Sequence, residues 1–281
     1  MNNRVLTFKQ LTAYQSYLRR EERANGTVEK YLRDIRAFFC WLNGRPVTKE
    51  LAHGWKDYLL SRHYAPITVN SMLSAVNGLL HFLDWDDCRV KFLKIQRRLF
   101  REEQRELSRL EYDRLLETAR ALGRERLALL METICATGIR VSEVRYITVE
   151  AAQKSRAEIM LKGKIRTILI PNKLCRKLLK YAKKQKAASG EIFLTKGGTS
   201  LSRKQIWTEM KSLCKRAGVE ASKVFPHNLR HLFATVFYRA CKDIVKLADV
   251  LGHSSIETTR IYLVTSGLEH ARRLERLGLV S

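Results

Sequence analysis

The residues with the clearest chemical potential lie between Pro226 and Val264, where histidine, arginine and tyrosine recur at short spacings. His227 and Arg230 are three residues apart, which places them one turn apart on one face of a helix. Pro226 suits the start of that helix because its missing N–H group is not needed there. An imidazole and a guanidinium on one helix face can bind an anionic group together.

The same stretch predicts a corner and then a further helix that carries the tyrosine. Gly252 can adopt the left-handed conformation that ends a helix, which leaves His253 at the corner. Ser254 and Glu257 have the spacing of a capping box, so we expect the next helix to begin there. Tyr262 lies about two turns into that helix and could meet His253 at the same place.

Side chains of these types meet the needs of a reaction at a phosphodiester. Such a reaction needs a nucleophile, cations beside the phosphate oxygens, and groups that accept and donate protons. The ordinary pKa of tyrosine is near 10, so a cation or a base must help the phenol to attack at neutral pH. Guanidinium groups are planar and always charged, and removing one from the phosphate would raise the barrier by about 3 kcal/mol.

The order of these residues resembles the signature of the tyrosine site-specific recombinases, the phage-integrase and Xer group. H-x-x-R-H is followed by L-G-H and, nine residues later, by a tyrosine. Upstream, ATGIRVSE closely resembles the first motif of that family. The resemblance implies that Arg140 is the first catalytic arginine and that Glu143 is its acidic neighbour, which positions the active site. His231 matches the pattern less closely.

A lysine is expected from a β-hairpin between these motifs. The β-prone runs EIML and TILI flank KGKIR, which predicts a hairpin with Gly163 in its turn. The family carries its catalytic lysine on such a hairpin in a K-G pattern, so the resemblance points to Lys162. Lys164 competes with it because the turn differs slightly in length from the family's pattern, and Arg166 is a third candidate.

The resemblance also implies a role for each matched residue. Tyr262 attacks to form a 3′-phosphotyrosine, Arg140 and Arg230 grip the phosphate, Lys162 protonates the leaving 5′ oxygen, His227 acts as base or orients the phosphate, and His253 donates a hydrogen bond to it. Rejoining needs no ATP because the phosphotyrosine keeps the energy of the broken bond. The sequence shows no carboxylate cluster of metal-binding type, so we expect neither a metal nor another cofactor.

The composition favours a polyanionic partner along the whole molecule. The chain of 281 residues has a net charge of +25, and both the first hundred residues and the remainder are basic. Double-stranded DNA is the simplest such partner, and a ribosome-associated or merely basic protein is the alternative. The sequence contains no signal peptide and no apolar run near 18 residues. Six cysteines without a C-x-x-C pair indicate reduced, buried thiols and a cytoplasmic protein.

The elements that position these residues are predicted to be mainly helices. Helices are expected at 8–23, 27–42, 48–62 and 67–83, with breaks at Asn25-Gly26 and Asn43-Gly44, and then at 109–121, 124–136 and 173–186. We therefore expect a mainly α protein with a small antiparallel β-sheet. A helical, SAM-like core DNA-binding domain would span 1–96, a linker 97–106 and an α+β catalytic domain 107–281. The resemblance implies that the two domains form a C-shaped clamp on DNA.

Further basic residues are expected to contact DNA phosphates. They lie on the helix 173–186 and on a later helix capped by Ser202, and they are Lys173, Arg176, Lys177, Arg203, Lys204 and Lys211. An ordinary solvated face is the alternative for the first helix. After Tyr262, an amphipathic tail helix is predicted from Leu268, Ala271, Leu274 and Leu277, and it would pack either on its own core or on a neighbouring protomer.

The resemblance implies an enzyme that cuts and rejoins DNA at specific sites. Strand exchange between two duplexes needs four active sites, so we expect a homotetramer with one dimer on each inverted-repeat core site. The need for a second recombinase or an accessory protein is left open. The alternatives are a type IB topoisomerase and an architectural protein that does not cleave. The early start of the core-binding helices favours a simple-site Xer-like recombinase or a compact mobile-element integrase.

Overall fold

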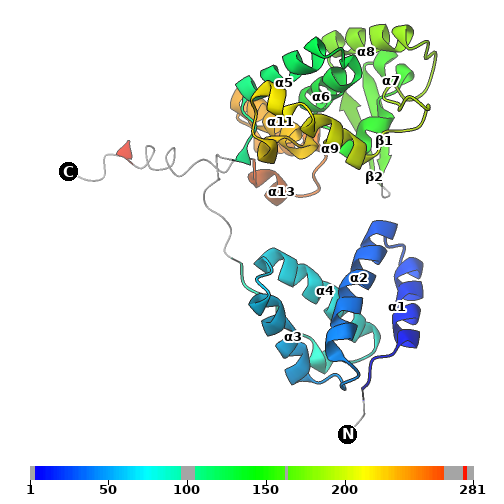
Figure 1. Cartoon of the computed structure of the whole chain (residues 1–281), viewed down its shortest axis with the longest axis vertical. Helices are drawn as coiled ribbons and strands as arrows, with labels where there is room; N and C mark the ends of the chain where they lie inside the picture. The colour runs from blue at the N-terminus through cyan, green and yellow to red at the C-terminus, as the bar shows by residue number, and fades with distance from the viewer. Residues whose placement is uncertain (1–3, 96–104, 162–163, 263–274, 277–281) are drawn as a thin grey trace. The chain divides into compact units, whose positions relative to one another are not determined.

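The computed structural model describes residues 4–95, 105–161, 164–262 and 275–276 (Figure 1). The chain divides into two compact units, Met1–Arg97 and Arg98–Ser281. Both units are built mainly from helices, and the described residues contain one antiparallel sheet of two strands. The predicted fold class is therefore confirmed. Most of the predicted linker and of the tail helix, including Leu268, Ala271, Leu274 and Leu277, lies outside the described residues.

The first unit consists of four α-helices and one short 3-10 segment. They are α1 (Phe8–Arg20), α2 (Asn25–Leu42), α3 (Lys49–Ser61), α4 (Pro66–Phe82) and η1 (Asp86–Cys88). Thr7 and Gln10 form the predicted capping box of α1, and Thr48 caps α3. The apolar stripe of α2 is buried, as its three- and four-residue spacing predicts.

The break between the first two helices comes earlier than the sequence suggested. Asn25 and Gly26 form the first turn of α2, and the break lies at residues 21–24, where Glu22 has a φ of 52°. The carbonyl of Ala24 accepts hydrogen bonds from the N–H groups of Thr27 and Val28, which starts the helix there. A glycine is tolerated at this point because the first N–H groups of a helix have no partner within the helix.

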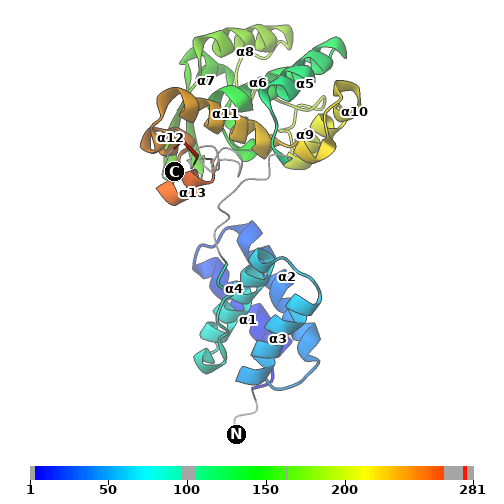
Figure 2. The same cartoon turned by 90° about the vertical axis from the view of Figure 1, so that its left-hand side faces the viewer.

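The second unit carries all the residues matched to the recombinase motifs. Its helices and strands are α5 (Arg109–Ala121), α6 (Glu125–Thr137), η3 (Val141–Tyr146), α7 (Val149–Gln153), β1 (Arg156–Leu161), β2 (Lys164–Leu169), α8 (Asn172–Lys184), α9 (Arg203–Lys211), α10 (Cys214–Ala217), η4 (Ala221–Lys223), α11 (Pro226–Cys241), α12 (Ile244–Leu251) and α13 (Ile256–Arg260). Helix α6 packs against α5, α8 and α11, while α12 contacts α11 and α13 (Figure 2).

The predicted hairpin is present as β1 and β2. The strands pair antiparallel, with Ile159 opposite Arg166 and Leu161 opposite Lys164. Strand β2 already begins at Lys164, so Arg166 lies on the strand and not in the turn. Lys162, the first candidate for the catalytic lysine, lies outside the described residues together with Gly163.

The cysteines agree only in part with the prediction of buried thiols. Cys88, Cys175 and Cys214 are buried, but Cys40 and Cys241 are exposed. Cys40 is one residue from the buried Phe38 stripe of α2 and faces away from it, while Cys241 ends α11. Among the residues that the structure describes, no helix is both long and apolar enough to span a membrane.

Candidate active site

Arg140 and Glu143 lie at the start of η3, which differs from the helix predicted near Ile139. The backbone of Arg140 is still extended, with ψ at 149°, and a 3-10 helix begins at Val141. The Glu143 carboxylate causes this geometry because it accepts the Arg140 backbone N–H at 2.7 Å and Nη1 at 3.0 Å. Glu143 is 1% exposed, whereas the Arg140 side chain is 41% exposed. A buried carboxylate thus holds an accessible guanidinium in place.

Arg230 is the buried centre of the site. Its guanidinium donates to the carbonyl of Gly138, to the carbonyl of Leu251 at 2.9 Å and to Nε2 of His253 at 2.9 Å. Both carbonyls lie at helix C-termini, where the helix dipole favours a cation. Burial lowers the pKa of Arg230, the nearby Arg140 cation lowers it further, and the Tyr262 phenol partly offsets both.

Gly138 allows Arg230 this close approach. It ends α6 with a φ of 64°, a conformation that side chains with a Cβ adopt at a cost. A Cβ at Gly138 would also collide with the ring of Phe233 on α11. The glycine of the ATGIR motif therefore lets α6 and α11 pack closely enough for Arg230 to reach its carbonyl.

His253 stands at the predicted corner after Gly252, which has a φ of 63°. Nε2 of His253 faces Arg230, and Nδ1 lies 2.9 Å from Oγ1 of Thr259. A guanidinium can only donate, so Nε2 accepts and Nδ1 carries the proton that is donated to Thr259. Burial and the surrounding arginine cations lower the pKa of His253 to about 4, so the ring is neutral at neutral pH.

Tyr262 follows α13 and does not lie within it. The predicted capping box is wrong by one residue, because the Ser255 hydroxyl, not that of Ser254, accepts the Glu257 N–H. The helix then ends at Arg260, and the Tyr262 N–H donates to the carbonyl of Thr259 at 3.0 Å. Tyr262 nevertheless meets His253, since their rings stack with centroids 6.0 Å apart.

The remaining matched residues are placed less completely. His227 begins α11 behind Pro226, as predicted, and stays exposed. Partial burial of its ring and the cations of Arg230 and Arg140 lower the pKa of His227 below its ordinary value. Lys162 is outside the described residues, and for Lys164 the structure gives only the start of β2, so neither lysine is selected.

Two residues contribute to the site in ways that the sequence did not predict. Thr259 is fully buried and holds the His253 ring, although its neighbours gave no sign of this contact. Arg166 was a third candidate for the lysine's role, but it binds Glu143 and the Leu251 carbonyl instead. His231 contacts the Tyr262 ring at a centroid distance of 5.0 Å, in accordance with a supporting position.

A cavity of about 570 Å³ opens onto this cluster. Its lining includes Arg140, Glu143, Arg166 and His253, together with Arg203 at the start of α9. Arginine side chains from three elements and a neutral histidine suit this cavity to a phosphate group.

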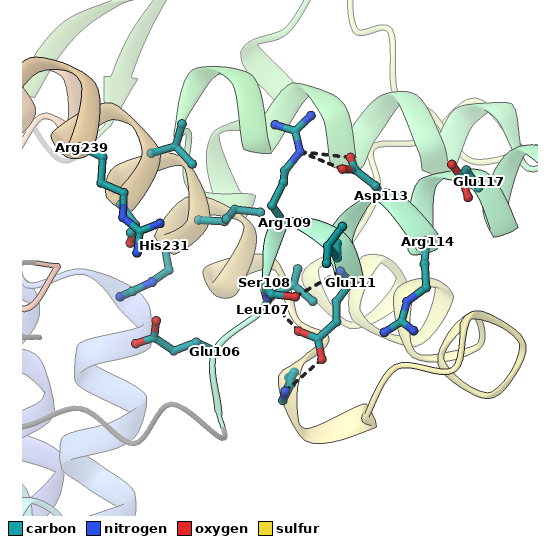
Figure 3. Close-up of a pocket in the computed structure, with 15 residues that line it drawn as sticks. Glu106, Leu107, Ser108, Arg109, Glu111, Asp113, Arg114, Glu117, His231 and Arg239 are labelled. Carbon is teal, nitrogen blue, oxygen red and sulfur yellow. Dashed lines mark hydrogen bonds and ion pairs between the residues drawn. The ribbon is translucent and has the colours of Figure 1, made fainter. Parts of the chain in front are cut away.

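A larger cavity of about 840 Å³ lies between the start of α5 and α11 (Figure 3). Glu111 borders it, closing the capping box with Ser108 and pairing with Lys223 at 2.9 Å. His231 also borders it, but the arginines of the first cluster do not. We therefore assign the chemistry to the smaller cavity.

The predicted DNA-contacting residues divide into two groups. Helix α8 lies at the end of its unit away from α13 in both views (Figures 1 and 2). Lys177 on that helix forms an ion pair with Glu132 at 2.8 Å, and Lys173 and Arg176 share this location. On α9, Arg203 reaches the site cavity, Lys204 is exposed, and Lys211 donates to the Ala221 carbonyl.

Comparisons with known proteins agree with this geometry. Residues 105–266 match the phage integrase family, and residues 11–87 match the N-terminal SAM-like domain of phage integrases. The chain is 28% identical over 274 residues to the tyrosine recombinase XerA of Thermococcus kodakarensis, covering 93% of this chain and 92% of that protein.

Solved structures show the same fold. One is a XerH site-specific recombinase bound to its difH substrate, with a TM-score of 0.67, 18% identity, and coverage of 97% of this chain and 90% of that one. Another is a lambda integrase tetramer bound to a Holliday junction, with a TM-score of 0.75, 17% identity, and coverage of 93% and 78%.

The chain therefore belongs to the phage integrase family, as its motifs indicated. It is a tyrosine recombinase, an enzyme that cleaves and rejoins DNA at specific sites. The comparisons do not favour the topoisomerase or the non-cleaving architectural protein.

Proposed function

We propose that this recombinase acts on a simple core site, as a Xer-like enzyme or a compact mobile-element integrase. The observation that carries the proposal is the cluster around Arg230. One buried guanidinium binds His253, lies beside the Tyr262 phenol and is close to the accessible Arg140. A phosphate gripped by Arg140 and Arg230 would thus lie next to a potential nucleophile.

The proposed reaction uses six residues. The Tyr262 oxygen attacks the phosphorus, and the bond from phosphorus to the 5′ oxygen breaks. His227, which its lowered pKa keeps neutral, accepts the phenol proton or orients the phosphate. Lys162, or Lys164 in its place, gives a proton to the departing 5′ oxygen. Arg140 and Arg230 neutralise the phosphate, and His253 donates a hydrogen bond to it; Glu143 supports Arg140.

Tyr262 must become more accessible before it can attack. Its side chain is 4% exposed and packs with Ala234, Leu247 and Leu251. It does not belong to the lining of the site cavity that holds Arg140 and His253. We therefore propose that DNA binding turns the segment after α13 so that the phenol enters the cavity.

The proposed assembly is a homotetramer on DNA, with a dimer on each inverted repeat. The lambda integrase structure, which is a tetramer on a Holliday junction, supports this assembly by analogy. We propose a core DNA-binding domain at 1–96, a linker at 97–106 and a catalytic domain at 107–281, closing as a clamp on DNA. Partner recombinases, accessory proteins and a cytoplasmic location remain predictions, as do phosphate contacts by Lys173, Arg176, Lys177, Arg203, Lys204 and Lys211.

Covalent capture tests the proposed function. The protein is incubated with sheared DNA of its host and quenched with SDS, and the protein-linked DNA is sequenced, with Tyr262→Phe in parallel. We expect adducts that concentrate at one imperfect inverted repeat and disappear in the variant. Adducts that scatter over the DNA would argue for relaxation chemistry, and DNA binding without adducts, even with a supplied partner recombinase, would refute the proposal.

A further inference from the structure

Arg166 makes contacts that join three separate parts of the catalytic unit. It lies on β2, opposite Ile159 of β1, and its side chain is 15% exposed. Nη2 donates to Oε2 of Glu143 at 3.2 Å, and Nη1 donates to the carbonyl of Leu251 at the end of α12. One guanidinium therefore connects the hairpin, η3 and the α12–α13 corner.

Each acceptor of Arg166 also serves a residue of the proposed phosphate grip. The Glu143 carboxylate holds Arg140 at 3.0 Å, and the Leu251 carbonyl accepts Arg230 at 2.9 Å. The hairpin turn with Lys162 ends two residues before Arg166 along the chain. Arg166 thus stands between the supports of both arginines and the turn that carries the candidate lysine.

Gly252 makes room for this guanidinium. The Arg166 side chain occupies the space where a Cβ on Gly252 would lie. The L-G-H sequence therefore serves two purposes, because its glycine both ends α12 and leaves space for an arginine from the hairpin. This fit fixes the hairpin against the residue that precedes His253.

The position is electrostatically costly, which argues against a role in packing alone. Burial lowers the pKa of Arg166 to about 10, and the cations of Arg230 and Arg140 lower it further, against the favourable effect of Glu143. Well-packed apolar groups commonly replace buried ion pairs without loss of stability. An arginine held between two other arginines is better explained by a need for its two-directional hydrogen bonding.

We propose that Arg166 is a positioning residue that aligns the lysine turn of the hairpin with the corner carrying His253 and Tyr262. Through this alignment the lysine ammonium would reach the departing 5′ oxygen. The inference rests on the proposed function, in which a hairpin lysine is the general acid. It assigns to Arg166 no contact with the DNA.

A substrate with sulfur in place of the bridging 5′ oxygen tests this role. A thiol has a pKa near 8.5, far below that of an alcohol, so a thiolate leaves without receiving a proton. General-acid catalysis contributes about 10²- to 10⁴-fold. We expect Arg166→Ala to slow cleavage of the oxygen substrate by about 100-fold and to cleave the sulfur substrate within about fivefold of the wild-type rate, as Lys162→Ala or Lys164→Ala should.

Matched variants separate alignment from general loss of structure. Arg156→Ala removes an exposed arginine from the same hairpin, and it should leave both rates unchanged. Arg166→Lys keeps the charge but cannot bridge two acceptors at once, so its rates should fall between wild type and Arg166→Ala. If Arg166→Ala does not fold, Arg166→Lys carries the same comparison of the two substrates.

The outcomes distinguish this inference from the proposed function. If sulfur rescues the lysine variant but not Arg166→Ala, Arg166 supports the phosphate grip and the inference is overturned while the function stands. If sulfur rescues neither lysine variant, the general-acid assignment fails and the inference fails with it. If the wild-type protein forms no covalent adduct with either substrate, the proposed function itself is refuted.

Discussion

Thr259 offers the most detailed test of how the site controls its histidine. Its Oγ1 is the partner of Nδ1 of His253, while Nε2 accepts from Arg230. For His253 to donate to a phosphate, the proton must instead be on Nε2, and Nδ1 must then accept from the threonine hydroxyl. A hydroxyl can make both hydrogen bonds, so Thr259 lets the neutral ring exchange tautomers without taking up a proton.

The substitution Thr259→Val removes this hydroxyl and nearly preserves the shape of the side chain. Thr259 is 0% exposed, so water cannot easily replace the lost partner. Leaving a buried polar group without its hydrogen bond costs about 1 to 3 kcal/mol. If this cost falls on the transition state, cleavage slows by about 5- to 150-fold, at about 1.4 kcal/mol for each factor of ten.

Single-turnover cleavage of a nicked core-site substrate measures the effect, together with DNA affinity and thermal unfolding. Thr259→Ser keeps the hydroxyl, and we expect it to cleave within about threefold of wild type. Both variants should bind DNA as the wild type does. The tautomer argument is refuted if Thr259→Val cleaves at the wild-type rate, or if Thr259→Ser is as slow as Thr259→Val.

Three further predictions concern the supports of the site. Glu143→Gln removes a buried carboxylate that holds two guanidinium groups, so it should lower stability by about 3 kcal/mol and Tm by about 10 °C, and an unchanged melting curve would contradict this. The pKa of His253, lowered to about 4 in the folded protein from an ordinary 6.5, means that stability is full above pH 6.5 and falls as pH drops toward 4. His253→Gln should lose this part of the pH dependence in chemical denaturation, and identical profiles would argue against a neutral buried ring. Gly252→Ala should destabilise more than Gly123→Ala, because both have positive φ but only Gly252 faces Arg166, and equal losses in urea unfolding would dispute that contact.

The sequence predicted the elements of the site better than their ends. Local rules were sufficient for Pro226 at the start of α11 and for Gly252 at the end of α12, because a missing N–H and a left-handed residue act on their own turn. The start of α13 was wrong because two neighbouring serines compete for the cap, and local spacing does not decide between them. Tyr262 still meets His253, since both ring positions depend on the corner.

Contacts between distant segments were beyond sequence reasoning. Arg166 and Leu251 are separated by 85 residues, and nothing in KGKIR shows that its arginine lies over Gly252. The 3-10 geometry at Arg140 likewise depends on the Glu143 carboxylate folding back to the backbone N–H. Such features arise from tertiary packing, which overrides helical propensity.

The central claim is that Tyr262 is the nucleophile, and mass spectrometry of a trapped protein–DNA adduct tests it most directly. The adduct is formed on the captured core site, digested with nuclease and protease, and searched for the peptide that carries a nucleotide. The account predicts a 3′-linked nucleotide on Tyr262 and no adduct in Tyr262→Phe, whose DNA affinity should match that of the wild type. A nucleotide on another residue, or an adduct that survives in Tyr262→Phe, would contradict it.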